Sequence, residues 1–579
     1  NFTSATNTYN TAVGMQAGTS VTTGVQNTLI GGQAGDAITT GANNASLGYG
    51  ALGATTTGIN NTGIGSGALF LNTTASNNTA VGTNALLANT TGSNNVAVGL
   101  NALDANTTGA SNVSVGSGAL GGNTTANNNT AVGTSSLLAN TTGTSNVALG
   151  TNALGANTTA SNNTGLGFRA LHVNTTGTQN TAVGSFSLDA ITTASNNTAI
   201  GYLSGSAITT GASNTLLGST AGDSITTASN NTAVGYNSLT ANTTGEASTA
   251  LGSLALDANT TGGFNTALGV HALGGNTTAS YNTAVGWGSL KDNTTGASLT
   301  AVGYAALDKN TTGDSNVAVG ESALGANTTA SNNTAVGTSA LVVNTTGASN
   351  TALGYQAMST CTTGGGNTAL GKDAGGALTT GNDNICIGLV AGTHDTSLQT
   401  GDNNILIGNY IDASAADTDN AIGIGYNVTA AGGYATIGIN TSDIRAQHGN
   451  VTWATVSDER YKKDIVDSTA GLSFINALQP RTFKYKNLGE LPETFSAYKA
   501  DSTEVFKNSD TNHGFIAQEV KAAIDADSSI KDGFRLWDDR EDGSQEVAEA
   551  ALIPVLVKAI QEQNALIEAL TTRITTLEG

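Results

Sequence analysis

Ser457 and Lys462, five residues apart, are the side chains of this sequence best suited to carry out a reaction. A serine hydroxyl is a poor nucleophile at neutral pH and needs a base within hydrogen-bonding reach. A lysine amine can be that base when burial lowers its pKa towards neutrality. A turn or bend would bring the two residues together. Taken alone, however, these residues favour a plainer interpretation, in which Ser457 and Asp458 cap a helix and Lys462 and Lys463 face solvent.

Glycan hydrolysis is a second chemistry to consider, because glycosidases use two carboxylates at a defined separation. Asp104, Asp189, Asp257 and Asp308 are candidate acids. They occupy the same position of a repeat, which we expect to face solvent, and none has an acidic neighbour at that position in the next copy. A depolymerase is therefore kept only as an alternative.

Metal and thiol chemistry have little support in the sequence. The five histidines are scattered, and we find neither a Ser-His-Asp set nor a metal-ligand cluster. Cys361 and Cys386 leave a disulfide open, although their separation of 25 residues is no multiple of the repeat. We predict no metal and no cofactor. Four acids near residue 410 lack the spacing of a calcium loop and are expected to be solvated: Asp402, Asp412, Asp417 and Asp419.

Charge is divided unevenly along the 579 residues. Residues 1–440 hold four basic and seventeen acidic residues, a net charge of −13, and the remainder contributes −8 of the total −21. Nucleic-acid binding needs clustered Lys and Arg, so we expect no nucleic-acid partner. No apolar run reaches the 18 or so residues of a membrane span, so we expect none.

A glycine recurs every 17 residues from Gly14 to Gly388, 23 times without an insertion or deletion. Such a period is typical of a solenoid, in which one repeat forms one coil. The residue before this glycine is always Val, Leu or Ile, and the residue before that is usually small. This alternation predicts a short strand with one buried face. The repeated glycine predicts a tight corner that needs positive φ or has no room for a side chain.

An Asn-Thr-Thr box recurs at Asn72, Asn89, Asn106 and eleven later positions. Each is a glycosylation sequon, but Ile191 and Leu378 are among the residues that replace the Asn in other repeats. A position that accepts Asn or an aliphatic residue favours an inward side chain. We therefore predict a stacked amide ladder rather than a modified surface.

The repeat, Asn-Thr-Ala-Val-Gly-x-x-Ala, resembles the left-handed β-roll repeats in the head domains of trimeric autotransporter adhesins over residues 10–390. We predict that 1–388 form a 17-residue-repeat β-solenoid, about 105 Å long at about 4.8 Å per coil. Its coil geometry and handedness stay open. Residues 389–456, where the period fails, are expected to be an irregular β cap and connector.

The C-terminus carries a heptad helix. Isoleucines recur every seven residues, and a second apolar position follows three residues after each, with Gln563 as its one polar member. This pattern predicts a coiled-coil seam. The predicted oligomerisation residues are Ile553, Leu556, Ile560, Ile567, Leu570, Ile574 and Leu577.

Residues 457–579 resemble the C-terminal intramolecular chaperone of phage tail fibres and spikes, including the endosialidases. The resemblance rests on Ser-Asp-Glu-Arg-Tyr-Lys-Lys-Asp-Ile from Ser457 and on three later blocks, 478–485, 513–520 and 552–562. It implies a trimerising domain that cuts itself off, with Ser457 as nucleophile, Lys462 as base and cleavage between Val456 and Ser457. With these blocks present, self-cleavage is favoured over the helix-cap interpretation.

The sequence therefore predicts a mostly β homotrimer, a long β-solenoid followed by a small α+β chaperone domain that ends in a coiled-coil helix. The predicted role is a phage tail fibre or spike in the virion tail that binds a host-surface glycan or protein. The enzyme activity would be a single self-cleavage by a Ser-Lys dyad. A bacterial surface adhesin without catalysis and an ice-binding solenoid are the alternatives.

Overall fold

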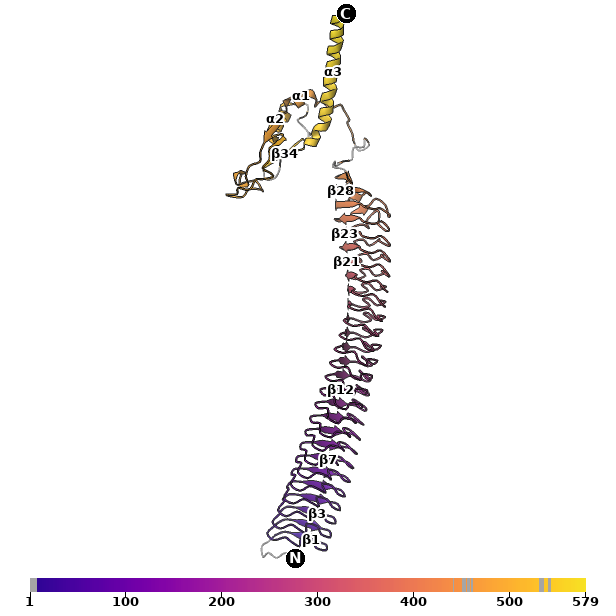
Figure 1. Cartoon of the computed structure of the whole chain (residues 1–579), viewed down its shortest axis with the longest axis vertical. Coiled ribbons are helices and arrows are strands. Elements are labelled where there is room, and N and C mark those ends of the chain that lie inside the picture. Colours follow the sequence, from indigo (N-terminus) through magenta and orange to yellow (C-terminus); the bar gives the residue numbers. More distant parts are fainter. Residues whose placement is uncertain are drawn as a thin grey trace. The chain divides into compact units, whose positions relative to one another are not determined.

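The computed structural model describes residues 8–440, 442–449, 454–455, 459, 462–528, 530, 536–539 and 543–579. The chain divides into two compact units, Asn1–Val456 and Ser457–Gly579. The first is built of stacked coils, drawn from indigo to orange in Figure 1. The second contains the three α-helices and ends in the long yellow helix.

Each 17-residue repeat forms one coil with a single three-residue strand, and the strands of successive coils pair in parallel without a shift. Val81, for example, lies opposite Val98. The result is a β-solenoid whose strands belong to one 28-stranded sheet, as the period predicts. The parallel strands are β1 Thr11–Val13, β2 Thr28–Ile30, β3 Ala45–Leu47, β4 Thr62–Ile64, β5 Thr79–Val81, β6 Val96–Val98, β7 Val113–Val115, β8 Thr130–Val132, β9 Val147–Leu149, β10 Thr164–Leu166, β11 Thr181–Val183, β12 Thr198–Ile200, β13 Thr215–Leu217, β14 Thr232–Val234, β15 Thr249–Leu251, β16 Thr266–Leu268, β17 Thr283–Val285, β18 Thr300–Val302, β19 Val317–Val319, β20 Thr334–Val336, β21 Thr351–Leu353, β22 Thr368–Leu370, β23 Ile385–Ile387, β24 Ile405–Ile407, β26 Ile422–Tyr426 and β28 Tyr434–Ile439.

The middle residue of each coil strand faces the solenoid interior, while its neighbours face out. It is small in most coils, but Leu29, Leu216 and Leu406 are fully buried at the same position. In β9, Ala148 is fully buried, whereas Leu149 is 47% exposed. In most coils a buried leucine from another position of the repeat, such as Leu154, fills the interior, so that a small residue is left behind the strand. The predicted one-sided burial is confirmed, and the buried side is that of the middle residue.

The repeated glycine makes a corner that no other residue fits. Gly150 has a φ of 133°, and a Cβ added there would lie 2.5 Å from the carbonyl oxygen of Gly167 in the next coil. Both reasons expected from the sequence, positive φ and close backbone approach, therefore hold at once.

A second left-handed position, four residues after this glycine, supplies the apolar core. Leu86 occupies it with a φ of 54° and is fully buried. Where a glycine replaces the leucine, as at Gly205, other aliphatic side chains fill the space: Leu216 lies 2.7 Å and Ile208 3.1 Å from a Cβ built at Gly205. Core volume is thus kept by exchanges between positions of the same and adjacent coils, as close packing requires.

The asparagine of the Asn-Thr-Thr box points inward and forms the predicted ladder. The Nδ2 of Asn140 donates to the Oδ1 of Asn123 at 2.9 Å and to the carbonyl of Gly143 at 3.0 Å. A second buried ladder comes from the asparagine that precedes each strand: the backbone N–H of Asn146 donates to the Oδ1 of Asn129 at 2.9 Å. These bonds satisfy polar groups that burial would otherwise leave unpaired.

The solenoid continues past residue 388 before it ends. Its next corner glycines, Gly408 and Gly425, follow at intervals of 20 and 17 residues, and Gly438, 13 residues further, lies inside β28 opposite Gly425. Strand β28 then pairs with an antiparallel strand, which ends the parallel stacking. The remaining strands of this unit are β25 Asp412–Ala413, β27 Thr429–Ala430, β29 Ser442–Gln447 and β30 Ala454–Thr455.

The second unit is a small α+β domain with its own core around Phe474, which is 1% exposed. No helix in the described part of the chain is both long enough and apolar enough to cross a membrane. The elements of this unit are α1 Leu472–Ala477, β31 Arg481–Phe483, η2 Leu488–Glu490, β32 Asn512–Gly514, α2 Ala517–Ala526, β33 Trp537–Asp539, β34 Gln545–Val547, η3 Glu549–Ala551 and α3 Leu552–Glu578.

Candidate functional site

The predicted nucleophile and cleavage site lie outside the described residues, since Val456 and Ser457 are not among them. Lys462 is described and exposed. Its backbone N–H donates to the carbonyl of Glu459 at 2.9 Å, a contact typical of a turn. The Ser-Lys pair remains a prediction.

The first two later sequence blocks meet in a β-ribbon. Strand β31, from the block 478–485, pairs antiparallel with β32, which begins the block 513–520. The Arg481 guanidinium then donates twice to the Glu519 carboxylate, at 2.9 and 2.7 Å. These bonds hold the pKa of Glu519 below its usual value, because they favour its charged form.

The third block joins the same domain through Glu562 of α3. Its Oε2 accepts the backbone N–H of Leu472 at 2.8 Å, at the first turn of α1. A carboxylate is stabilising there, because the first N–H groups of a helix lack partners within it. Leu552 and Val555 of α3 pack against the core around Phe474. The blocks singled out in the sequence therefore converge on one fold.

Beyond this contact, α3 exposes its heptad seam. The seven predicted oligomerisation residues are between 42% and 80% exposed in the single chain: Ile553, Leu556, Ile560, Ile567, Leu570, Ile574 and Leu577. The face of α3 that packs on the domain is a different one, formed by Leu552, Val555 and Ala559. The helix thus has one apolar face for its own domain and a second that no residue of this chain covers in the described structure.

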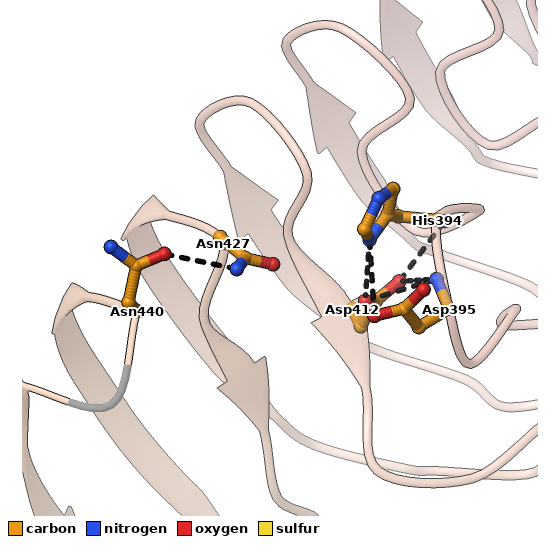
Figure 2. A network of polar contacts seen from close by, with 5 residues as sticks. All are labelled: His394, Asp395, Asp412, Asn427 and Asn440. Atoms are coloured by element: carbon orange, nitrogen blue, oxygen red, sulfur yellow. Dashed lines mark hydrogen bonds and ion pairs between the residues drawn. The ribbon is translucent and has the colours of Figure 1, made fainter.

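A cluster of His394, Asp395 and Asp412 lies in the solenoid where the 20-residue coil departs from the period, as Figure 2 shows. The Nδ1 of His394 is 3.4 Å from the Oδ2 of Asp395 and 3.5 Å from that of Asp412. The carboxylate of Asp412 accepts the backbone N–H of His394 at 3.0 Å and that of Asp395 at 3.1 Å.

The expectation that Asp412 is solvated was wrong, because this residue is only 4% exposed. It stands four residues after Gly408, at the position where most coils bury a leucine. Its carboxylate instead satisfies the backbone of the three-residue insertion in the preceding coil. The insertion and the acid at a core position were together the signal that could have revealed this cluster. Asp417 and Asp419 are exposed and Asp402 is partly buried.

The candidate acids of the solenoid are partly buried rather than fully solvent-facing. Burial raises the pKa of Asp104 and of Asp257. Asp308 is tied to a neighbouring coil by Lys309, whose Nζ lies 3.2 Å from it and 2.8 Å from Asp292. A lysine between two carboxylates favours the charged form of both, whereas a glycosidase needs one carboxylic acid that can donate a proton.

Both cysteines are buried free thiols, so the disulfide left open by the sequence does not form. Cys361 replaces the ladder asparagine, and its Sγ donates to the carbonyl of Gly364 at 3.5 Å, the bond that asparagine makes elsewhere. Burial raises the pKa of Cys361 to about 11 and that of Cys386 to about 12.

Comparison with known proteins bears on the C-terminal unit. No curated protein matches the chain. A family model, Peptidase_S74, described as the chaperone of endosialidase, matches residues 457–527. This match begins at Ser457 and includes β31, β32 and α2. A β-solenoid followed by such a domain fits a tail-fibre-like protein with an intramolecular chaperone. The resemblance of the C-terminal unit to the chaperone of endosialidase is thus confirmed over residues 457–527.

Proposed function

We propose that this chain is a phage tail fibre or spike that attaches to the surface of a host cell, and that its C-terminal unit assembles three copies and then releases itself. The observation that carries this proposal is the family match at 457–527, directly after the last coils of a β-solenoid. The mature fibre would be residues 1–456. Its host partner would be a surface glycan or protein.

The chaperone role has a physical reason in the repeat. Identical coils stack on one another, and a shift by one coil preserves most of their contacts. Chains that associate through such coils alone would therefore form staggered assemblies. A C-terminal unit that brings the three chains together first fixes their register. Uniform trimers formed by a chain without this unit would contradict the proposal.

Release requires one acyl transfer and one hydrolysis. Lys462 takes the proton from the Ser457 hydroxyl, whose oxygen attacks the carbonyl carbon of Val456. Lys462 gives this proton to the leaving nitrogen, and the peptide bond breaks, leaving an ester between Val456 and the Ser457 side chain and a free Ser457 amine. Water then hydrolyses the ester, which regenerates the hydroxyl and leaves a carboxylate on Val456. The reaction occurs once per chain and needs no cofactor.

Mass spectrometry of the purified chain tests this step. Wild type is expected to give two fragments, the second beginning at Ser457, whereas Ser457→Ala and Lys462→Ala stay full length. Lys463→Ala is the matched control, because it removes a neighbouring exposed lysine, and it should still cleave. Full-length wild-type protein in a folded trimer would exclude autoproteolysis and favour an uncleaved fibre or adhesin.

Assembly is tested separately on the Ser457→Ala chain, which keeps α3. Ile567→Glu places a charge in the exposed seam and is expected to abolish the uniform trimer, because a charge buried between helices is costly. Ala565→Glu adds the same charge on the opposite face of α3 and should leave the trimer intact. Sedimentation equilibrium measures both. Equal masses for the two variants would show that the seam does not hold the copies together.

A further inference from the structure

The outer face of the solenoid sheet carries a continuous apolar column. The third residue of every strand from β1 to β24 is Val, Leu or Ile, and all of these are exposed or partly exposed. Leu251 and Leu353, for example, are 43% and 44% exposed. The first residue of each strand forms a parallel column of Thr, Val, Ile and one Ala. Neither column contains a charged residue in any of these strands.

The size of this surface exceeds what an isolated protein normally exposes. A fully exposed aliphatic side chain offers on the order of 100 Å² of apolar area. With somewhat less than half of each side chain exposed, the third-residue column alone offers on the order of 1,000 Å² per chain. The largest apolar patch of a typical monomer is about 300–600 Å². A stable interface buries about 800 Å² per partner, so the column is large enough for one.

Charge is confined to other columns of the solenoid, although residues 1–440 have a net charge of −13. Asp189 and Asp257 lie five residues after a corner glycine, and Glu246 lies in the loop before a strand. Two like-charged solenoids would repel each other through these surfaces. The sheet face is uncharged and apolar in these strands, so two solenoids can approach on it without this repulsion.

The repeat of the column identifies its occupant. Apolar side chains recur once per coil, at the spacing of paired strands, about 4.8 Å, over 24 strands. A partner with another spacing would fall out of phase after a few coils, whereas another copy of this chain matches it throughout. We propose that the outer face of β1 to β24 is the interface along which parallel copies of this chain pack. This inference rests on the proposed assembly. It names the surface that holds the copies together after the C-terminal unit has been released.

Cross-linking of the full chain through single added cysteines tests the interface. Leu251→Cys lies in the apolar column, and Glu246→Cys is the control, exposed in the same coil but in a different column. Packed sheets lie about 10 Å apart, so a bismaleimide of about that reach is suitable. Cys361 and Cys386 are buried thiols with raised pKa and should not react. Leu353→Cys repeats the test elsewhere in the column.

Leu251→Cys and Leu353→Cys are expected to give at least tenfold more cross-linked chains than Glu246→Cys on a denaturing gel. The native mass and the extent of cleavage are measured on the same samples. An oligomer with no cross-link in the column overturns the interface and leaves the proposed fibre intact. A monomer that still cleaves at Ser457 also overturns the interface, without touching autoproteolysis. Rapid complete labelling of the Leu251→Cys variant at its new thiol by a small maleimide, within the oligomer, would show an open face available to a different partner, and would likewise overturn the proposal.

Discussion

The two units of this chain are held together in opposite ways. In the solenoid, a residue contacts its counterpart 17 positions away, as Asn140 contacts Asn123. In the C-terminal unit, decisive contacts join distant segments, as when Leu472 binds Glu562 across 90 residues. The solenoid can therefore grow coil by coil, but its contacts do not distinguish one coil from the next. The C-terminal unit has one arrangement only, which makes it suited to define a register.

Their cores differ accordingly. The solenoid interior consists of alanines, leucines and buried amides repeated in columns, so each coil contributes little alone. The C-terminal unit centres on one aromatic residue, Phe474, with Phe515 and Trp537 against the same cluster. Damage to one coil should stay local in the first unit, whereas loss of one central side chain should unfold the second. The substitutions below test this difference, beginning with the largest expected effect.

Phe474→Ala should destabilise the C-terminal unit by about 3–5 kcal/mol, because it removes a fully buried aromatic side chain and leaves a cavity. That is comparable with the whole stability of a small domain. Limited proteolysis and hydrogen exchange are expected to show residues 462–579 unprotected while the coils keep their protection. Phe506→Ala, at a 43% exposed position, is the control. Equal loss of protection in both units would contradict the separation of their cores.

Gly150→Ala should cost about 2–4 kcal/mol, since it combines a strained positive φ with a contact of 2.5 Å to Gly167. Hydrogen exchange should increase in the coils next to residue 150 and stay unchanged ten coils away, because each coil contacts only its neighbours. Thr151→Ala, at the adjacent exposed residue, should leave both stability and hydrogen exchange unchanged. Increased exchange along the whole solenoid would mean that it unfolds as one unit.

Asn140→Ala should cost about 1–3 kcal/mol, because it removes the donor to the buried Oδ1 of Asn123 and one of the two bonds made by the buried amide of Asn157. Asn140→Ile should cost less, since Ile191 fills the same position together with Leu188 in another coil. Thermal unfolding of the two variants in parallel measures the difference. A larger loss for isoleucine would show that volume, not amide bonding, limits this position.

Much of this architecture follows from the sequence because each position of the repeat meets the same physical constraint in every coil. Gly150 can only be glycine, and the position of Asn140 holds an amide in most coils and an inward-facing aliphatic residue in several others, so the corner and the ladder could both be predicted. The direction in which the strand faces was less obvious. The larger Leu149 points out and Ala148 points in, because leucines from another position of the repeat, such as Leu137 and Leu154, already fill the interior.

The candidate site shows the limit of the same approach. The blocks around Arg481, Glu519 and Glu562 were found by resemblance, but their mutual contacts depend on a tertiary fold that no period encodes. Asp412 was misjudged because an aspartate in a loop-like stretch is usually solvated. Only its alignment with the leucine position of other coils, beside an insertion, indicates burial. Long-range packing, not local pattern, determined what was missed.

Loss of the ion pair between Arg481 and Glu519 has the smallest expected effect on stability. It shows how much charge, as opposed to packing, contributes to the C-terminal unit. Both groups are at the surface, so we expect only a slight change of stability from Arg481→Gln. The pKa of Glu519 is the sensitive measure. It is lowered in the folded state, so the pair stabilises the fold above the ordinary glutamate pKa, and this contribution is lost as the pH falls through the lowered value. Carboxyl ¹³C NMR should show the Glu519 midpoint rising in Arg481→Gln.

Lys521→Gln is the matched control for this titration, because Lys521 pairs with Asp525 at 2.6 Å on the same helix and should leave Glu519 unchanged. Added salt should shift the wild-type midpoint upward by screening the exposed pair. An unchanged midpoint in Arg481→Gln would mean that the first two sequence blocks are joined by the β31–β32 pairing alone. The ion pair would then be a consequence of the C-terminal fold and not one of the contacts that give it a single arrangement.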